Sequence, residues 1–185
     1  MADSIEHRAA VIAECRASAD SSGAALLVGY AAVFRSQTTI AGAWVEEVAP
    51  TAFDKTLADI AEGRADVVLV IDHDPQQLLA RTRSGTLKLS KDSHGLKVEA
   101  TLPDTQLGRD IAELVRRGDA YGMSFSFLPR KDGETWQGNR RTLRDVELFD
   151  VSVVRTAPAY SATEVSVRAK QEADRRRLGY VLAAL

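Results

Sequence analysis

Most apolar positions of the chain recur with the period of two, or in the short continuous runs, that are typical of β-strands. Roughly seven such segments follow one another: Ala25–Phe34, Trp44–Pro50, Ala65–Asp72, a hairpin within Thr86–Leu102 around Gly95, Ala120–Pro129, Arg140–Phe149 and Asp150–Val154. The run Ala65–Asp72 is apolar at nearly every position, which predicts a strand that is buried on both faces.

Two segments within this series follow the helical period instead. The segment Thr51–Ile60 has apolar residues at helical spacing, and Thr51 is the predicted N-cap. The segment Asp104–Gly118 has the same spacing, and Gly118 is the predicted helix end. A further short helix is expected over Glu6–Ala19, and Arg130–Asn139 is predicted to be a mobile loop.

The order of these elements indicates the fold class. The strands do not alternate regularly with helices, so a parallel sheet built from βαβ units is disfavoured. We expect a mainly β (α+β) protein, with a closed or nearly closed barrel of about seven strands and peripheral helices. The expected division is an N-terminal helical or flexible segment over 1–24, a core domain over 25–163, and a C-terminal tail or helix over 164–185.

Composition narrows the function classes. The chain has 185 residues, of which 27% are charged, and its net charge of −2 offers no basic face for nucleic acid. The lone Cys15 excludes a disulfide framework and a cluster of thiolate metal ligands. The first 23 residues interrupt their apolar positions with charges, so no signal peptide is expected, and no run is long enough to span a membrane.

His73 is the histidine whose position suggests chemistry. It directly follows the buried run and lies between Asp72 and Asp74, with Pro75 next. A histidine fixed at the end of a core strand can act as a general base, because its ordinary pKa of ~6.5 lies near neutrality. The alternative is a histidine that is merely hydrogen-bonded at a strand end. His7 and His94 lie in polar segments, and a turn explains His94.

A metal site built from Asp72, His73 and Asp74 is a third reading of the same triplet. Successive side chains of an extended chain point in opposite directions, so His73 would point away from both carboxylates. We therefore expect neither a metal nor a cofactor.

The segment GMSFSF (Gly122–Phe127) places two hydroxyls on one face of a strand. Ser124 and Ser126 alternate with Met123, Phe125 and Phe127, which predicts that the apolar face lies in the core. Each serine is either an ordinary solvent-facing residue or a nucleophile, and a nucleophile needs a base within hydrogen-bond reach.

An acid that orients the imidazole would complete a serine–histidine–acid set. Asp150 begins the apolar run Asp150–Val154, and Glu147 is the alternative acid. Both are also explained as exposed carboxylates of a strand.

Several segments together resemble the prohead maturation proteases of tailed bacteriophages, serine peptidases with a fold related to the herpesvirus assemblins. The matching segments are GYAAVF, EEVAPTAFDKTL, DHDPQQLLARTRSGTLKLSKDSHGLKVEATLPDT, LVRRGDAYGMSFSF and LFDVSVVRTAPAYSAT. They extend from about Leu27 to Thr163, and their combination is specific although each one alone is weak.

The resemblance implies His73 as the catalytic base and Ser124, rather than Ser126, as the nucleophile. The third member falls on Asp150, where family members most often carry glutamate, which is one methylene longer. Backbone N–H groups that stabilise the oxyanion are also needed, and the loop after Pro129 is the segment to inspect.

The resemblance further implies an endopeptidase that cleaves scaffold, or the scaffolding segment of the major capsid protein, and that also cleaves itself. It would act inside assembling proheads in the cytoplasm of a bacterial host, and the related assemblins make a homodimer one expected state. Neither a nucleic acid nor a membrane is an expected partner. The alternative is a catalytically inactive scaffolding or capsid-binding module with the same fold.

Overall fold

The computed structural model describes residues 5–10, 16–19, 25–120 and 122–155. Within these residues the chain forms thirteen strands and two helices. Their bounds are β1 Glu6–Ala10, β2 Arg16–Ala19, β3 Ala25–Val33, β4 Thr38–Ile40, β5 Trp44–Val48, α1 Asp54–Ala61, β6 Val68–Ile71, β7 Asp74–Arg81, β8 Leu87–Lys91, β9 Gly95–Thr101, α2 Gln106–Arg117, β10 Gly122–Pro129, β11 Glu134–Gln137, β12 Arg140–Leu143 and β13 Val146–Val154. Cys15 and the predicted tail over 164–185 lie outside the described residues.

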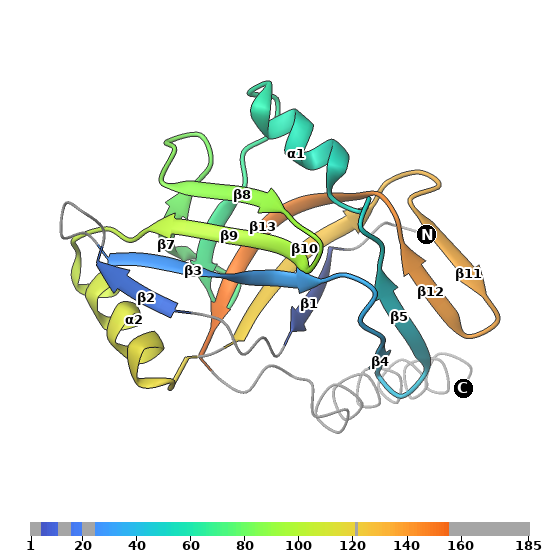
Figure 1. Ribbon diagram of the computed structural model, residues 1–185, viewed down its shortest axis with the longest axis horizontal. Helices are drawn as coiled ribbons and strands as arrows, with labels where there is room; N and C mark the ends of the chain where they lie inside the picture. Colours follow the sequence, from blue (N-terminus) through green and yellow to red (C-terminus); the bar gives the residue numbers. More distant parts are fainter. Residues whose placement is uncertain (1–4, 11–15, 20–24, 121, 156–185) are drawn as a thin grey trace, which may run out of the picture.

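The strands form three sheets, which Figure 1 shows from one side. The first has the order β1-β10-β13-β6-β7, the second β2-β3-β9-β8 and the third β11-β12-β5-β4. Most neighbours are antiparallel, but β13 pairs with β6 and β12 pairs with β5 in parallel. The predicted mainly β class with two helices is confirmed, and the closure of the strands into a barrel stays a prediction.

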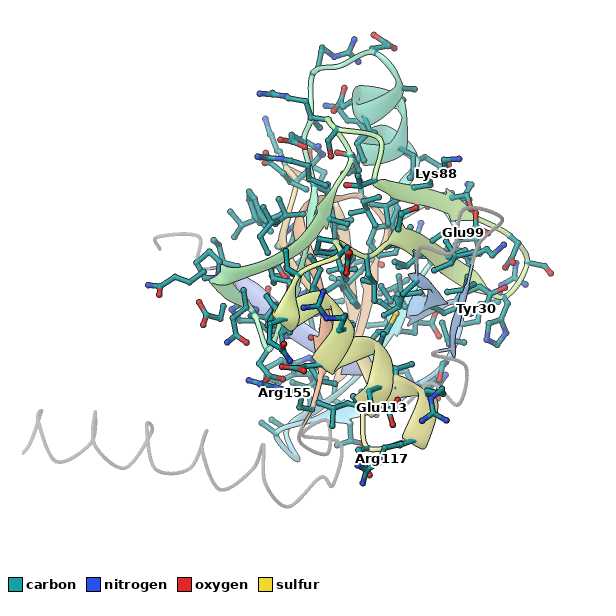
Figure 2. The ribbon with its side chains drawn as sticks, turned by 90° about the vertical axis from the view of Figure 1, so that its left-hand side faces the viewer. Tyr30, Lys88, Glu99, Glu113, Arg117 and Arg155 are labelled. Atoms are coloured by element: carbon teal, nitrogen blue, oxygen red, sulfur yellow. The ribbon has the colours of Figure 1, made fainter. Side chains whose placement is uncertain are left out.

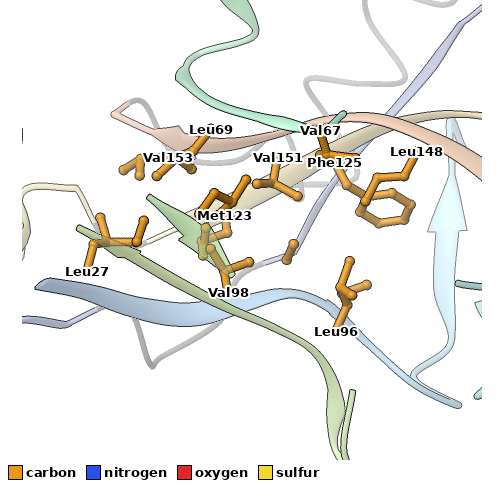
Figure 3. Packing of buried hydrophobic residues seen from close by; sticks show 14 of the residues in the cluster. Leu27, Val67, Leu69, Leu96, Val98, Met123, Phe125, Leu148, Val151 and Val153 are labelled. Atoms are coloured by element: carbon orange, nitrogen blue, oxygen red, sulfur yellow. The ribbon is translucent and has the colours of Figure 1, made fainter. Parts of the chain in front are cut away.

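The main core lies between the first and second sheets (Figure 3). Leu27, Leu96 and Val98 of the second sheet face Met123 and Phe125 of the first, and all five are buried. Since strand side chains alternate between faces, this packing directs Ser124 and Ser126 to the opposite face of β10. The predicted two-faced character of this strand is therefore confirmed.

The helix α2 follows the sequence signals closely. The Thr105 hydroxyl accepts a hydrogen bond from the Gly108 N–H, and the chain leaves the helix at Gly118 with a φ of 80°, which glycine adopts without steric cost. Figure 2 shows Glu113 and Arg117 on its outer side, where both are exposed. The start of α1 differs from the prediction, because the Thr51 hydroxyl donates to the Arg144 carbonyl and does not cap the helix.

Two of the predicted segments are wrong where the structure describes them. A helix was expected over Glu6–Ala19, but β1 pairs with β10 and β2 pairs with β3, so pairing with distant strands overrides the local helical pattern. A mobile loop was expected over Arg130–Asn139, but β11 pairs with β12 there. The remaining unpredicted strands, β4 and β7, bring the count above the expected seven.

A cluster of charged side chains, the β1 charge cluster, joins β1 to the third sheet. It consists of Glu6, Arg8, Glu46, Glu134 and Arg141. Arg141 donates two hydrogen bonds of 2.7 Å to the two oxygens of Glu6, and Arg8 donates to both oxygens of Glu46. Arg141 also binds Glu46 at 3.0 Å, and these two side chains are 6% and 4% exposed. Such desolvated, bidentate pairs fix geometry, although the pair itself stabilises the fold little compared with apolar packing.

Removing one member of the cluster is expected to destabilise the protein strongly. The substitution Arg141→Met leaves the carboxylates of Glu6, Glu46 and Glu134 with Arg8 as the one remaining cation of the cluster, and removing one partner of a buried ion pair typically costs about 3–5 kcal/mol. Urea unfolding followed by circular dichroism measures this loss. The matched control is Arg109→Met, because Arg109 pairs with Asp104 at the surface and such pairs contribute about 0–1 kcal/mol. Equal effects of the two substitutions would contradict a structural role for the cluster.

Candidate active site

His73 lies in the two-residue turn of the β6–β7 hairpin. The strands pair up to Ile71 and Asp74, so Asp72 and His73 are the two turn residues. Both have positive φ, 49° and 58°, as type I′ hairpin turns require. Aspartate and histidine enter this left-handed region more readily than most residues. The buried strand β6 ends at Ile71, and Pro75 lies in the returning strand β7.

Hydrogen bonds to β13 hold this turn in place. The N–H of Asp72 donates to the Val153 carbonyl at 3.0 Å, and the N–H of His73 donates to the Ser152 hydroxyl at 3.0 Å. The Asp72 carboxylate accepts from both the backbone N–H and the guanidinium of Arg155. The backbone of His73 is thus fixed against the strand that also carries Asp150.

Three side chains that are distant in sequence meet at this turn. The Nε2 atom of His73 lies 2.5 Å from the Ser124 hydroxyl, and Nδ1 lies 2.6 Å from Oδ1 of Asp150. An ionised carboxylate can only accept, so Nδ1 carries the proton and donates a hydrogen bond to Asp150. Nε2 is then the acceptor for the Ser124 hydroxyl. The structure therefore brings together His73, Ser124 and Asp150, the three residues that the sequence singled out.

Asp150 accepts hydrogen bonds from three side chains. His73 and Ser152 donate to Oδ1, and Ser126 donates to Oδ2. Burial is the largest influence on the Asp150 carboxyl and raises its pKa. The hydrogen bonds from His73, Ser126 and Ser152, with the attraction of the His73 ring, outweigh it and leave the pKa below its ordinary value. Asp150 is therefore ionised at neutral pH and oriented on both oxygens.

The serines of β10 and β13 are buried, although the sequence allowed them to be solvent-facing. Ser124 is 2% exposed and Ser126 is 1% exposed. In the β10–β13 register Ser124 lies opposite Ser152, and Ser126 lies opposite Asp150. Sequence reasoning missed the positions of Ser126 and Ser152 around the carboxylate. The spacing of two residues between Asp150 and Ser152 on one strand is the signal that could have revealed Ser152.

The other acids are engaged elsewhere. Glu147 is exposed, and its carboxylate lies 3.9 Å from Arg130. Asp74 accepts from the N–H of Gln76 and from the side chain of Gln77. No three metal-binding side chains converge in the described part of the chain, and the carboxylates of Asp72 and Asp74 both have partners other than His73. The geometry supports Asp150 as the acid that orients His73.

The loop after Pro129 does not lie at this site. It begins six residues along an extended strand from Ser124, which corresponds to roughly 20 Å at ~3.3 Å per residue. Its N–H groups at Arg130 and Gly133 are bonded to backbone carbonyls. These observations do not favour the loop after Pro129, the segment that the sequence suggested inspecting, as the source of the oxyanion donors.

A second histidine lies at the site and was missed in the sequence. The His7 ring centroid is 4.4 Å from that of His73, and the two rings are tilted by 58°. His7 is on β1, opposite Ser126 of β10. In a strand, His7 lies on the face opposite to Glu6 and Arg8. The helix predicted over this segment concealed this placement.

The arrangement can activate an alcohol. A base that contacts the Ser124 hydroxyl can take its proton, and an ionised acid behind the base stabilises the imidazolium that results. A serine, a histidine and an acid in this geometry suit acyl transfer.

Comparisons with known proteins point in the same direction. The model of the family described as caudovirus prohead serine protease matches residues 13–176 of the chain. Among solved structures, the chain is similar to the capsid assembly protease gp21 of bacteriophage T4, with a TM-score of 0.50 and 14% identity. That alignment covers 81% of this chain and 95% of the phage T4 chain, and at this identity it concerns the fold alone. No match was found among curated proteins.

None of the helices in the described residues is both long and apolar enough to cross a membrane.

Proposed function

The chain belongs to the caudovirus prohead serine protease family, and from this premise we propose that Ser124, His73 and Asp150 are the catalytic residues of a capsid maturation endopeptidase. The observation that carries the proposal is the continuous contact from Ser124 through His73 to Asp150, with distances of 2.5 and 2.6 Å. The fold similarity to a phage capsid assembly protease agrees with it.

The proposed reaction has two acyl-transfer steps. Ser124 Oγ attacks the carbonyl carbon of a peptide bond while its proton passes to His73 Nε2. The C–N bond then breaks, the leaving amine takes the proton from His73, and an ester to Ser124 remains. Water attacks this ester by the same route and releases Ser124. Asp150 stabilises the imidazolium in both steps and keeps the proton of the neutral ring on Nδ1.

The burial of Ser124 has a consequence for substrate access. With 2% of the residue exposed, a peptide carbonyl reaches Oγ only after the groups that cover it move. The described conformation is therefore a closed one, and we propose that the substrate or the assembling shell opens it.

The proposed substrates are scaffold protein or the scaffolding segment of the major capsid protein, together with the chain itself. These follow from family membership, as does the place of action inside assembling proheads in the bacterial host. A barrel related to the herpesvirus assemblins, and activation by dimerisation, belong to the same proposal.

The alternative is an inactive module that binds scaffold or capsid. Its motives from the sequence are the short acid at position 150 and the long C-terminal tail, which lies outside the described residues. The 2.6 Å contact between Asp150 and His73 removes the first motive and supports the enzyme.

Covalent labelling tests the proposal directly. The full chain is co-expressed with its capsid and scaffold partners and treated with a fluorophosphonate. An activated serine Oγ attacks the phosphorus of this reagent and displaces fluoride. We expect peptide mapping to place the label on Ser124, and gel analysis to show shortened capsid or scaffold protein. A label on another residue would assign the nucleophile to that residue instead of Ser124. If no residue is labelled and no partner is shortened, the enzyme assignment is contradicted and the inactive module is favoured.

A further inference from the structure

The strand β1 brings His7 to the catalytic face of the first sheet. β1 is the edge strand beside β10, and its register places His7 opposite Ser126 and Ala9 opposite Ser124. The His7 ring then contacts the His73 ring, with 4.4 Å between the centroids. A residue at the edge of the sheet thus contacts the proposed catalytic base.

The β1 charge cluster anchors the backbone that carries this ring. Successive side chains of a strand point to opposite faces, so Glu6 and Arg8 share the face that His7 does not occupy. Glu6 is bound to Arg141 and Arg8 to Glu46, both by two hydrogen bonds. The chain on both sides of His7 is therefore anchored to the third sheet, which fixes the backbone from which the His7 ring reaches His73.

The electrical surroundings of His7 favour its neutral form. His7 is exposed at the edge of the sheet, and partial burial of its ring is the largest cause that lowers the pKa of His7 below its ordinary value of 6.5. The neighbouring His73 and Arg8 lower it further, and Asp150 raises it. On the neighbouring strand β10, Ser126 lies opposite His7. At neutral pH the ring therefore carries no charge.

We propose that His7 is a positioning residue, whose neutral imidazole packs against His73 and supports its cycle between base and imidazolium. This role rests on the proposed function, because it concerns the proton that His73 takes from Ser124. A neutral ring beside His73 leaves the attraction between the imidazolium and Asp150 unopposed. A charged ring would repel the imidazolium, so protonation of His7 below its pKa would oppose the reaction.

A permanent charge at position 7 tests this inference. We expect His7→Lys to lower the rate of Ser124 labelling on its plateau by roughly three- to tenfold, the effect of a partly screened charge a few ångströms away. The same charge should move the acidic limb of the pH–rate profile to lower pH by about half a unit to one unit, because it disfavours the protonated form of His73. His7→Gln, which adds no charge, should leave the acidic limb close to that of the wild type.

The measurement is the labelling rate of the full chain between about pH 5 and 9, under conditions in which the wild type is labelled. The matched control is His94→Lys, because His94 is exposed in the loop between β8 and β9 and contacts Tyr30 rather than the catalytic face. Partial unfolding of a variant would lower the labelled fraction but would not move the acidic limb. The position of that limb therefore separates a role at His73 from a loss of folding.

The outcomes distinguish the two proposals. If the wild type is labelled at Ser124 and His7→Lys matches His94→Lys in both rate and acidic limb, His7 has no positioning role although the protease assignment stands. If Ser124 of the wild type is unreactive at every pH, the proposed function fails and this role fails with it. A shifted limb in His7→Lys alone supports both.

Discussion

Replacing Ser124 with alanine is expected to abolish cleavage of capsid or scaffold partners. The substitution removes the oxygen that would form the ester, while His73 and Asp150 keep their contact. Loss of the nucleophile in another serine protease reduced kcat by about 10⁶-fold, so we expect a residual rate at the background level. Gel analysis of partner processing after co-expression, with labelling by the fluorophosphonate, measures both the product and the reactive residue.

Ser126→Ala is the matched control for this substitution. Ser126 lies two residues away on the same face of β10 and is buried to the same degree, but its hydroxyl donates to Asp150 rather than contacting His73. We expect Ser126→Ala to retain labelling at Ser124 at a reduced rate, because the carboxylate loses one of its three donors. If Ser126→Ala abolishes processing and Ser124→Ala does not, the two serines must exchange roles.

Asp150→Asn is expected to reduce kcat by about 10⁴-fold, the loss seen when the acid of another Ser–His–Asp protease is made an amide. Asp150 offers two oxygens to three donors: His73, Ser126 and Ser152. Asparagine has one oxygen and places an N–H₂ group where the other oxygen accepts. That group can donate to Nδ1 of His73, which moves the proton of the neutral ring to Nε2 and leaves no acceptor for Ser124.

Cleavage kinetics and the imidazole signals of His73 in the ¹⁵N spectrum test this prediction together. The control is Glu147→Gln, since Glu147 is exposed and contacts Arg130 rather than His73. We expect that variant to stay within about twofold to threefold of the wild type, as substitutions at exposed positions usually do. A large loss in Glu147→Gln, with Asp150→Asn unaffected, would make Glu147 the orienting acid.

The sequence revealed the site better than it revealed the fold around it. The alternation along Gly122–Phe127 placed Ser124 and Ser126 on one face of a strand. The choice of Ser124 and of Asp150 came from the resemblance to the family's motifs. His73 was found because it follows a buried apolar run, although it lies in a turn rather than at the end of an extended strand. The turn residues Asp72 and His73 have positive φ, but neither is a glycine or an asparagine, the residues that usually reveal such a turn in a sequence. The hairpin could therefore not be predicted.

The other errors have a common physical origin in pairing between distant segments. β1 and β2 read locally as a helix, and β11 as a loop, because the groups that stabilise them are on other strands. The bonds of Arg8 to Glu46 and of Arg141 to Glu6 join residues 38 and 135 positions apart, so no local window contains both partners. His7 was missed for this reason, since only the pairing of β1 with β10 places it beside His73.

The position of β10 inside its sheet limits how negative charge can be neutralised at the reaction centre. Hydrolases whose nucleophile stands at a sharp bend between a strand and a helix use an amide next to that residue for this purpose. Here Ser124 belongs to a strand with neighbours on both sides, and the amides from Met123 to Phe127 face the ladders of β1 and β13. Compensation for a developing alkoxide must therefore come from another segment of the protein. Inhibitors that rely on the backbone amide next to a nucleophile at such a bend would find no free amide beside Ser124. Ligands that accept a hydrogen bond from a donor on another segment are therefore favoured.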